Sequence, residues 1–306
     1  MCDKSGCCKY GRIGGQALIE GVLMISPDRR AMAVRNPRRE IIVEYLPPKR
    51  RIPGDNIALI RGSIRLVQQL SVGLKAMTRS ADIAFDEEDS EKKGNFAEVL
   101  TMLTSFVIAI LAFILLPNLL VTGFAKYALH VDPTSGYSAT VFNLVEGLLR
   151  ICIFLAYIFF ATKLSDIKRV WMYHGAEHMT IACNEAGEDL TVENVRKYSR
   201  LHPRCGTAFL VIVMIVGILV VALTGWNAWY INLLWRIVLL PVVAGVAYEI
   251  ISLAGKYDNI LTRVISKPGL WLQLLTTAEP EAEMIEVAIE ALKAVRGDNY
   301  VIERCN

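Results

Sequence analysis

Four long apolar segments constrain the fold of this chain more than any other feature. A helix needs roughly 20 apolar residues to cross a bilayer core of about 30 Å, and the segments that reach or approach this length are 99–124, 141–162, 207–223 and 233–253. Hydrophobic residues make up 54% of the 306 residues and charged residues 21%, against about 45–50% and 25% in soluble domains. We therefore expect an α-helical integral membrane protein with about four transmembrane helices, which excludes a simple soluble globule and a disordered chain.

Lys and Arg are distributed unevenly around these segments. Of the 33 in the chain, 17 precede residue 97, seven lie in 163–206 and six follow residue 253, whereas the other two connections hold only Lys126 between them. Cytoplasmic connections of membrane proteins carry the excess of Lys and Arg, so we expect both termini and the loop 163–206 on the cytoplasmic side. The net charge of +3 is too small to indicate a nucleic-acid partner.

The apolar segments divide the chain into five predicted parts. Residues 1–96 form a cytoplasmic β-meander followed by a basic amphipathic helix, 97–162 form a first transmembrane hairpin, and 163–206 form a cytoplasmic histidine-rich loop. Residues 207–253 form a second transmembrane hairpin, and 254–306 form a cytoplasmic tail with an amphipathic helix. The lipid bilayer is therefore the first predicted partner of the chain.

The soluble parts show strand and helix patterns. Apolar runs at 18–25, 31–35 and 40–46, separated by turn-forming residues, predict a three-stranded meander. Helical spacing predicts a helix over 57–85, which either lies on the cytoplasmic membrane surface or packs on the meander. A second amphipathic helix is predicted over 280–295, with a proline in its first turn.

The loop 163–206 holds three of the four histidines, and two of them form a metal-binding pattern. His174, Glu177 and His178 match H-x-x-E-H, the inverted form of the zinc-peptidase signature. Residues i and i+4 of a helix face one side, so one metal ion can take a nitrogen from each histidine. Glu177 borders the same face and is the candidate general base, taking a proton from an activated water.

Two further residues of the loop are candidates to complete such a site. Zinc takes three or four nitrogen and sulfur ligands, and His202 and Cys205 lie together before the third apolar segment. We expect His174, His178 and His202 to hold a divalent metal, with zinc preferred, and Cys205 to be a competing third or a fourth ligand. The alternative interpretations are that His202 is a solvated histidine at a helix end and that Cys205 is a small residue packed among apolar side chains.

The backbone around these residues is expected to be helical. One helix should continue from the second apolar segment over 164–186, because this stretch has no proline. A second, short helix should begin after Thr191 as its N-cap and end near His202, because Pro203 disfavours helical geometry in the residue before it.

Charged residues inside the apolar segments are a second source of candidates. Glu249 lies near the predicted cytoplasmic end of its segment, on the side of the histidines, so it is a candidate further ligand or a hydrogen-bond acceptor for an imidazole. Alternatively, the Glu249 side chain reaches toward the bilayer interface. Glu146, Arg150 and Arg236 are expected toward the opposite leaflet, as a paired structural cluster.

The seven cysteines do not indicate a disulfide framework, because their number is odd and the chain is not short. Cys2, Cys7 and Cys8 contain no C-x-x-C pair, which favours a thiol-bearing tail over a metal site. The roles of these three residues and of Cys305 stay open.

Several motifs, in a fixed order, resemble one known family. They are Gly-Gly-Gln-Ala-Leu-Ile-Glu-Gly-Val at 14–22, Tyr-His-Gly-Ala-Glu-His at 173–178, His-Pro-Arg-Cys-Gly-Thr at 202–207, Tyr-Glu at 248–249, and the run 273–292. In that order they resemble the YqhQ-like family of bacterial membrane proteins, a family of unknown function described as predicted metal-dependent enzymes. The resemblance implies a multi-span protein of the bacterial inner, cytoplasmic membrane.

The sequence thus predicts a membrane-embedded, metal-dependent hydrolase whose site faces the cytoplasm and whose substrate is a peptide or a lipid-linked group. The alternative is a non-enzymatic membrane scaffold that binds a protein partner and holds a structural metal or none. A transporter is a third and weaker hypothesis, because four spans leave little room for a transport pathway.

Overall fold

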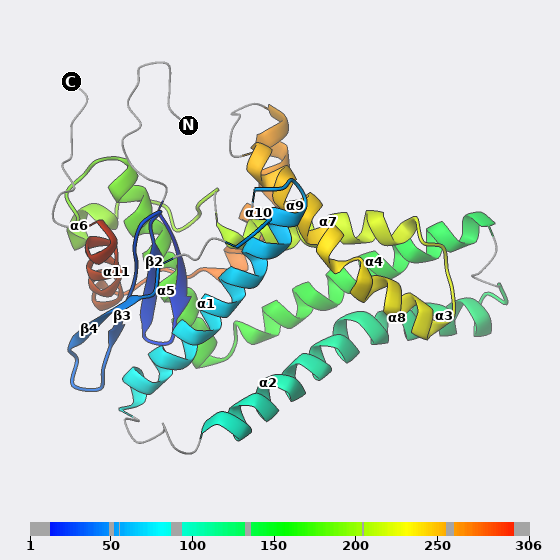
Figure 1. The fold of residues 1–306 in the computed structure, drawn as a ribbon, viewed down its shortest axis with the longest axis horizontal. Coiled ribbons are helices and arrows are strands. Elements are labelled where there is room, and N and C mark those ends of the chain that lie inside the picture. Colours follow the sequence, from blue (N-terminus) through cyan, green and yellow to red (C-terminus); the bar gives the residue numbers. More distant parts are fainter. Residues whose placement is uncertain are drawn as a thin grey trace.

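The computed structural model describes residues 13–48, 52–54, 56–86, 94–131, 136–203, 205–254 and 260–296. Within these ranges the chain is mostly helical, with one four-stranded antiparallel sheet near its N-terminus (Figure 1). The sheet lies at one end of the molecule together with helices from the middle and the end of the chain, and the long apolar helices extend toward the other end. Cys2, Cys7, Cys8 and Cys305 lie outside the described residues.

The predicted meander has four strands rather than three. They are β1 (Gly14–Leu18), β2 (Gly21–Ile25), β3 (Arg30–Arg35) and β4 (Ile41–Leu46), and they lie side by side in that order. The apolar run 18–25, predicted as one strand, turns back on itself, so that Leu18 pairs with Gly21. Glu20 takes a φ of 49° at this turn, a left-handed geometry that non-glycine residues adopt mainly in turns.

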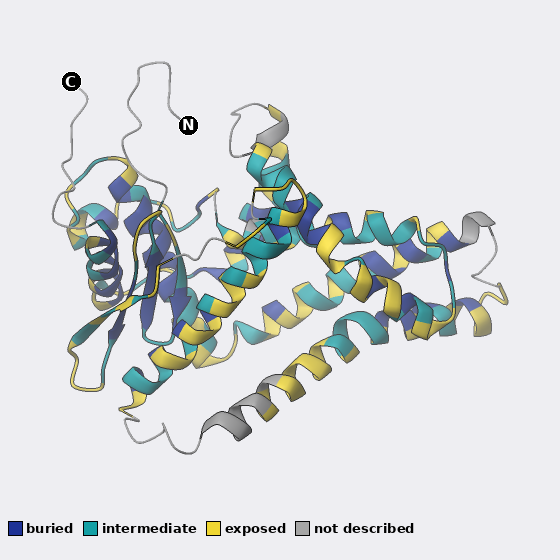
Figure 2. Cartoon of the chain, viewed as in Figure 1, coloured by how far each residue is buried: buried dark blue, intermediate teal, exposed yellow. Residues whose placement is uncertain are grey.

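Both faces of the sheet are buried. One face packs against α5 (Ser165–Glu185) and α11 (Ala282–Arg296), and the other packs against α1 (Ile60–Phe85) (Figures 1 and 2). Alternation along a strand sends neighbouring side chains to opposite sides. Val22 and Met24 accordingly lie in the core beneath α5 and α11, and Leu23 lies in the core beneath α1.

The predicted helix over 280–295 is confirmed as α11. Its predicted apolar positions are all buried, at 0–5% exposure: Ile285, Ala288, Ile289 and Leu292. Arg35 on β3 forms a 3.0 Å ion pair with Glu286 on α11. The N-terminal sheet, the histidine-bearing helix and the C-terminal helix therefore share one hydrophobic core.

The predicted helix over 57–85 is also confirmed, as α1, but its apolar stripe is not the side that packs. The buried positions are small residues, among them Gly62 beside α9 (Leu240–Ala254) and Ala76 and Ala84 on the sheet. The large apolar residues of the stripe point outward instead, with exposed fractions of 50–63% at three positions: Val67, Leu70 and Leu74. α1 thus packs through its small face and leaves its apolar stripe uncovered among the described residues.

The first predicted span is one continuous rod built of three pieces, α2 (Gly94–Ile110), the π-helical turn η2 (Leu111–Leu115) and α3 (Leu116–Tyr127). Pro117 lacks an N–H and its ring crowds the preceding turn. A π-helical turn before it widens the helix there, so the proline does not end the rod.

The other apolar helices are α4 (Gly136–Ala161), α7 (Gly206–Ala222), α8 (Trp229–Val238), α9 and α10 (Ile260–Thr276). By length and composition, two helices of the described residues can cross a membrane, at Leu103–Tyr127 and Ala139–Ala161, or three if α8 and α9, bent by 46°, form one broken span. The expected four spans are thus met in part. The 17 residues of α7 extend only about 26 Å at 1.5 Å per residue, short of a bilayer core of about 30 Å.

Candidate metal site

Helix α5 carries the histidine pair. It does not continue from α4 as predicted, because Leu164 adopts an extended conformation (φ −79°, ψ 130°) and α5 begins at Ser165. His174 and His178 lie one turn apart on α5, with ring centroids 4.3 Å from each other. They are 7% and 1% exposed, respectively, so the pair lies inside the protein.

Each imidazole is held by a backbone carbonyl at its Nδ1 atom. His174 Nδ1 lies 2.8 Å from the carbonyl oxygen of Thr276, and His178 Nδ1 lies 2.6 Å from that of Arg200. A carbonyl oxygen only accepts hydrogen bonds, so each Nδ1 carries the proton and each Nε2 presents a lone pair. Metal-binding histidines are commonly oriented in this way, by an acceptor on the ring nitrogen that does not bind the metal.

The two Nε2 atoms and the sulfur of Cys205 form a group of three donors. His174 Nε2 lies 3.2 Å from Cys205 Sγ, and the three candidate ligand atoms lie within 4.8 Å of one another. His178 Nε2 is buried and has no hydrogen-bond partner among the described residues. Ligands about 2.0–2.3 Å from a tetrahedral zinc ion are roughly 3.3–3.7 Å apart. The 3.2 Å between His174 Nε2 and Cys205 Sγ is close to this range, and nitrogen and sulfur are donors that zinc accepts.

Cys205 is fixed at the N-cap of α7. Its sulfur accepts from the backbone N–H and the hydroxyl of Thr207, at 3.5 and 3.3 Å. The sequence offered Cys205 only as a competing or fourth ligand, and the structure places it as the third donor of the group.

His202, the predicted third ligand, is adjacent to this group and does not belong to it. Its ring centroid lies 5.6 Å from that of His178, but its Nε2 lies 3.6 Å from the carboxylate of Glu185. The Gln273 side chain holds the His202 backbone, accepting from its N–H at 2.8 Å and donating to its carbonyl at 2.9 Å. The short helix before it, α6 (Val192–Val195), has Thr191 as its N-cap as predicted but ends well before His202.

Glu177 is buried next to the histidines, at 4% exposure. Burial raises the pKa of its carboxyl above the ordinary value, and the neighbouring imidazoles of His174 and His202 oppose that shift. A Cβ atom at Gly15 on β1 would lie 2.8 Å from Glu177 Oε1. It would also lie 2.7 Å from the backbone carbonyl oxygen of Leu23, so glycine at position 15 lets β1 pass close to both β2 and this carboxylate, a role that the sequence did not reveal.

The segment after α10 supports the site and was missed by sequence reasoning. Besides Thr276, which holds His174, Thr277 accepts from the guanidinium of Arg200 through its hydroxyl (2.7 Å) and through its carbonyl. Arg200 in turn holds His178 through its own carbonyl. Both histidines are thus tied to the end of α10, one directly and one through Arg200. Backbone acceptors have no signature in the amino-acid sequence.

Gly175, inside the H-x-x-E-H pattern, lets this segment approach α5. A Cβ atom at Gly175 would lie 2.2 Å from the carbonyl oxygen of Ala278, and the Ala278 N–H donates to Trp171 on α5 at 2.9 Å. The glycine at this position is therefore required by packing rather than by metal binding.

Glu249, predicted as a further ligand or an imidazole acceptor, lies elsewhere. Its carboxylate accepts from Arg61 Nε at 2.7 Å and from the Leu59 N–H at 3.2 Å. These contacts are at the crossing of α9 and α1, where a second bond from the same guanidinium completes an ion pair. Glu249 therefore joins α9 to the start of α1.

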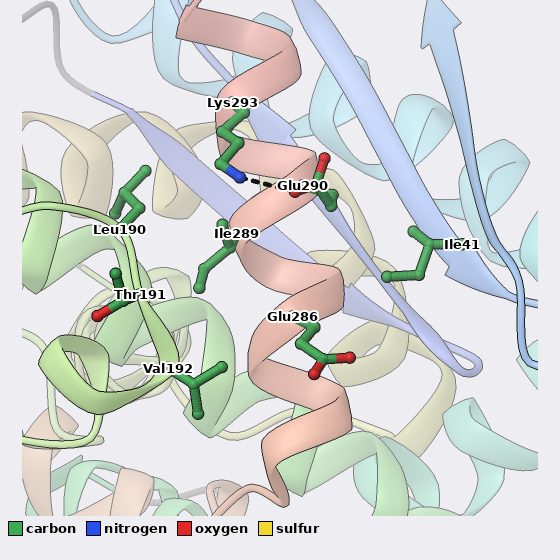
Figure 3. Close-up of a pocket in the computed structure, with 8 residues that line it drawn as sticks. All are labelled: Ile41, Leu190, Thr191, Val192, Glu286, Ile289, Glu290 and Lys293. Carbon is green, nitrogen blue, oxygen red and sulfur yellow. Dashed lines mark hydrogen bonds and ion pairs between the residues drawn. The ribbon is translucent and has the colours of Figure 1, made fainter.

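A cleft of about 400 Å³ lies apart from these residues, between β4, the start of α6 and α11 (Figure 3). Its lining includes apolar Ile41, Leu190 and Ile289 and the ion pair of Glu290 with Lys293. None of the predicted site residues lines it.

Comparison with known proteins agrees with the resemblance seen in the sequence. The family model described as "Protein of unknown function (DUF1385)" matches residues 57–298. The chain belongs to this family. It is also 35% identical, over 298 residues, to "Uncharacterized protein YqhQ" of Bacillus subtilis (strain 168), a match that covers 91% of this chain and 90% of that protein. No solved structure matches the chain.

Proposed function

We propose that the chain is a membrane-embedded, zinc-dependent hydrolase, with His174, His178 and Cys205 as the metal ligands. One observation carries the proposal. Both imidazoles donate through Nδ1 to a backbone carbonyl, so both Nε2 lone pairs are left for a metal, and that of His178 is buried with no hydrogen-bond partner among the described residues. Leaving such a group unsatisfied costs about 1–3 kcal/mol, which a bound cation would offset.

Three protein ligands leave a fourth position open, as in catalytic zinc sites. Bound to these three ligands, zinc would polarise the scissile group and activate the attacking water. Glu177 would accept the proton of that water and pass it to the leaving group. Thr276 and Arg200 would hold the imidazoles in the tautomer that the metal needs.

The proposed location is the cytoplasmic face of the bacterial inner membrane, with four spans and both termini inside. Cys205 caps the apolar helix α7, and Thr276 ends α10, whose Trp271 and Leu274 are 66% and 52% exposed. Aromatic and apolar side chains at a helix end are typical of the membrane interface. A site beside them would receive a peptide or a lipid-linked group from the interface.

The test is the zinc content of purified full-length protein, measured by elemental analysis. We expect about one zinc per chain, lost in His178→Ala and in Cys205→Ser, and retained in Glu177→Gln, which removes the general base but no ligand. His202→Ala should also retain zinc. Equal zinc in wild type, His178→Ala and Cys205→Ser would refute the ligand set.

A structural metal in a non-enzymatic scaffold is the second candidate, because the burial of His178, at 1% exposure, is also typical of a closed site. The two functions differ in the effect of Glu177→Gln. An enzyme loses hydrolysis of membrane-derived peptides or lipids while keeping its zinc, whereas a scaffold keeps both its zinc and a partner that co-purifies from native membranes.

A further inference from the structure

A group of three charged side chains, two of them buried, lies between two apolar helices, outside the metal site. The carboxylate of Glu146 on α4 accepts from Arg150, one turn further along α4, and from Arg236 on α8, using a different oxygen for each. Glu146 is 1% exposed and Arg236 is 5% exposed. The structure thus shows the pairing that the sequence predicted for these residues.

The charges in this group do not balance. One carboxylate faces two guanidinium groups, and because arginine stays protonated in proteins, the group carries a net charge of +1. The Nε atoms of both arginines are buried and have no hydrogen-bond partner in the described part of the chain. An uncompensated buried charge is strongly destabilising, so an anion from outside the described chain is expected to neutralise it.

The surface around the group indicates what kind of anion fits. Side chains next to the group on both helices are large, apolar and 42–61% exposed: Val145, Leu148, Trp235 and Ile237. Glu146 lies seven residues into the apolar stretch Ala139–Ala161, about 10 Å from its start at 1.5 Å per residue. Arg150, with 20% of its side chain exposed, is the accessible arginine of the group, and a long arginine side chain can reach across such a depth toward the bilayer surface. A ligand with a negative headgroup and apolar chains matches this surface.

We propose that Arg150 and Arg236 bind the phosphate group of an anionic lipid, with Glu146 holding the two guanidinium groups together. The planar guanidinium forms paired, charge-assisted hydrogen bonds with phosphate oxygens. Free phosphate offers the same oxygens but has no chains to cover the exposed apolar side chains, so a phospholipid is the preferred source.

Native mass spectrometry of the full-length protein in detergent tests this, with phosphatidylglycerol, phosphatidylcholine of the same acyl chains, and inorganic phosphate as probes. We expect wild type to retain phosphatidylglycerol in preference to phosphatidylcholine. Arg150→Gln makes the group neutral and leaves the Glu146–Arg236 pair intact, so the protein should fold and bind phosphatidylglycerol at least about tenfold more weakly, as for the loss of a charge-assisted hydrogen bond. Inorganic phosphate that displaced phosphatidylglycerol from wild type would support the same phosphate site and identify the free ion as its source.

Two further variants separate a site from general attraction. Lys126→Gln removes an exposed positive charge outside the group and should leave lipid retention unchanged. Glu146→Gln raises the net charge to +2 and should strengthen retention if the variant folds; if it does not fold, Arg150→Gln and Lys126→Gln decide the matter. Any of four results would overturn the proposal. Two concern Arg150→Gln: retention equal to that of wild type, or a loss equal to that of Lys126→Gln. The other two are weaker retention by folded Glu146→Gln and no lipid preference in wild type.

Discussion

At the scale of single residues, the two hydrogen bonds to Nδ1 decide what the histidine pair can do. His174 is bound by Thr276 directly, whereas the acceptor of His178 belongs to Arg200, whose own side chain is fastened to Thr277. The position of His178 therefore depends on a residue that touches no ligand atom of the site.

Replacing Arg200 with Ala is expected to weaken zinc binding about 10–100-fold, the usual effect of losing an outer partner of a metal ligand. The carbonyl of residue 200 remains, but it is no longer held against Thr277. Thr277→Val, which removes only the hydroxyl, should cause a smaller loss. Affinity is measured by competition with a chelator, and Arg196→Ala, at an exposed position nearby, is the control. Unchanged affinity in Arg200→Ala would contradict this positioning role.

Gly175 offers a second prediction at this scale. A methyl group there meets the carbonyl oxygen of Ala278 at 2.2 Å, so Gly175→Ala should lower the free energy of unfolding by about 1–3 kcal/mol, the usual cost of overpacking. Gly123 on α3 has nothing within 4 Å of the position of an added Cβ, and Gly123→Ala should not destabilise. Thermal unfolding in one detergent compares the two variants; similar losses in both would refute the packing argument.

How much of the site the sequence predicts depends on the kind of contact. The spacing of His174 and His178 follows from helical periodicity, and Cys205 was named as a candidate from its type. The acceptor at Thr276 is 102 residues away from His174 in the sequence. It is a backbone oxygen, so it cannot be recognised from the residue type. The sequence favoured His202 over Cys205 as the third ligand. No pattern in it shows that Gln273 holds the backbone at 202.

At the scale of helices and strands, periodicity predicts which segments are helical better than it predicts which side is buried. In α1 the sequence shows an apolar stripe that either faces the membrane surface or packs on the meander, and in the structure the side that packs consists of small residues such as Gly62 and Ala76. Small side chains allow close approach of two backbones, and this approach leaves the larger apolar residues outside.

The exposed stripe of α1 is expected to lie in the membrane interface. A photoreactive amino acid in place of Leu70 should form adducts with lipid in native membranes, detected by mass spectrometry. The same amino acid in place of Gln69, which is also exposed but on the other side of the helix, should not. Equal labelling at the two positions would contradict an interfacial helix.

Strand and helix ends were the weaker part of the sequence prediction. The break between α4 and α5 (residues 162–164) includes Leu164 in an extended conformation, and the turn between β1 and β2 (residues 19–20) includes Glu20 at a positive φ. Neither residue type is a strong breaker, so tertiary contacts rather than local preference set these ends.

At the scale of the whole molecule, the uneven distribution of Lys and Arg predicts one orientation. The sheet, α5 and α11 should all lie in the cytoplasm, and the connection between α3 and α4 outside. Alkaline phosphatase, active only outside, should be active when inserted at exposed His130 and inactive when fused to the C-terminus. Green fluorescent protein should give the reverse pattern, and activity of the C-terminal phosphatase fusion would contradict the orientation.

The shared core of the sheet, α5 and α11 has a consequence for biosynthesis. Helix α11 follows the other elements of the described residues in the chain, and it covers the same face of the sheet as α5. The sheet leaves the ribosome first, but α11 can cover its part of that face only after residue 296 has been translated. By then the apolar helices of the described residues have already been translated, so the core that includes α5 and α11 is completed after them. Ribosome stalling before Ala282 should therefore leave a nascent chain whose strands are protease-sensitive.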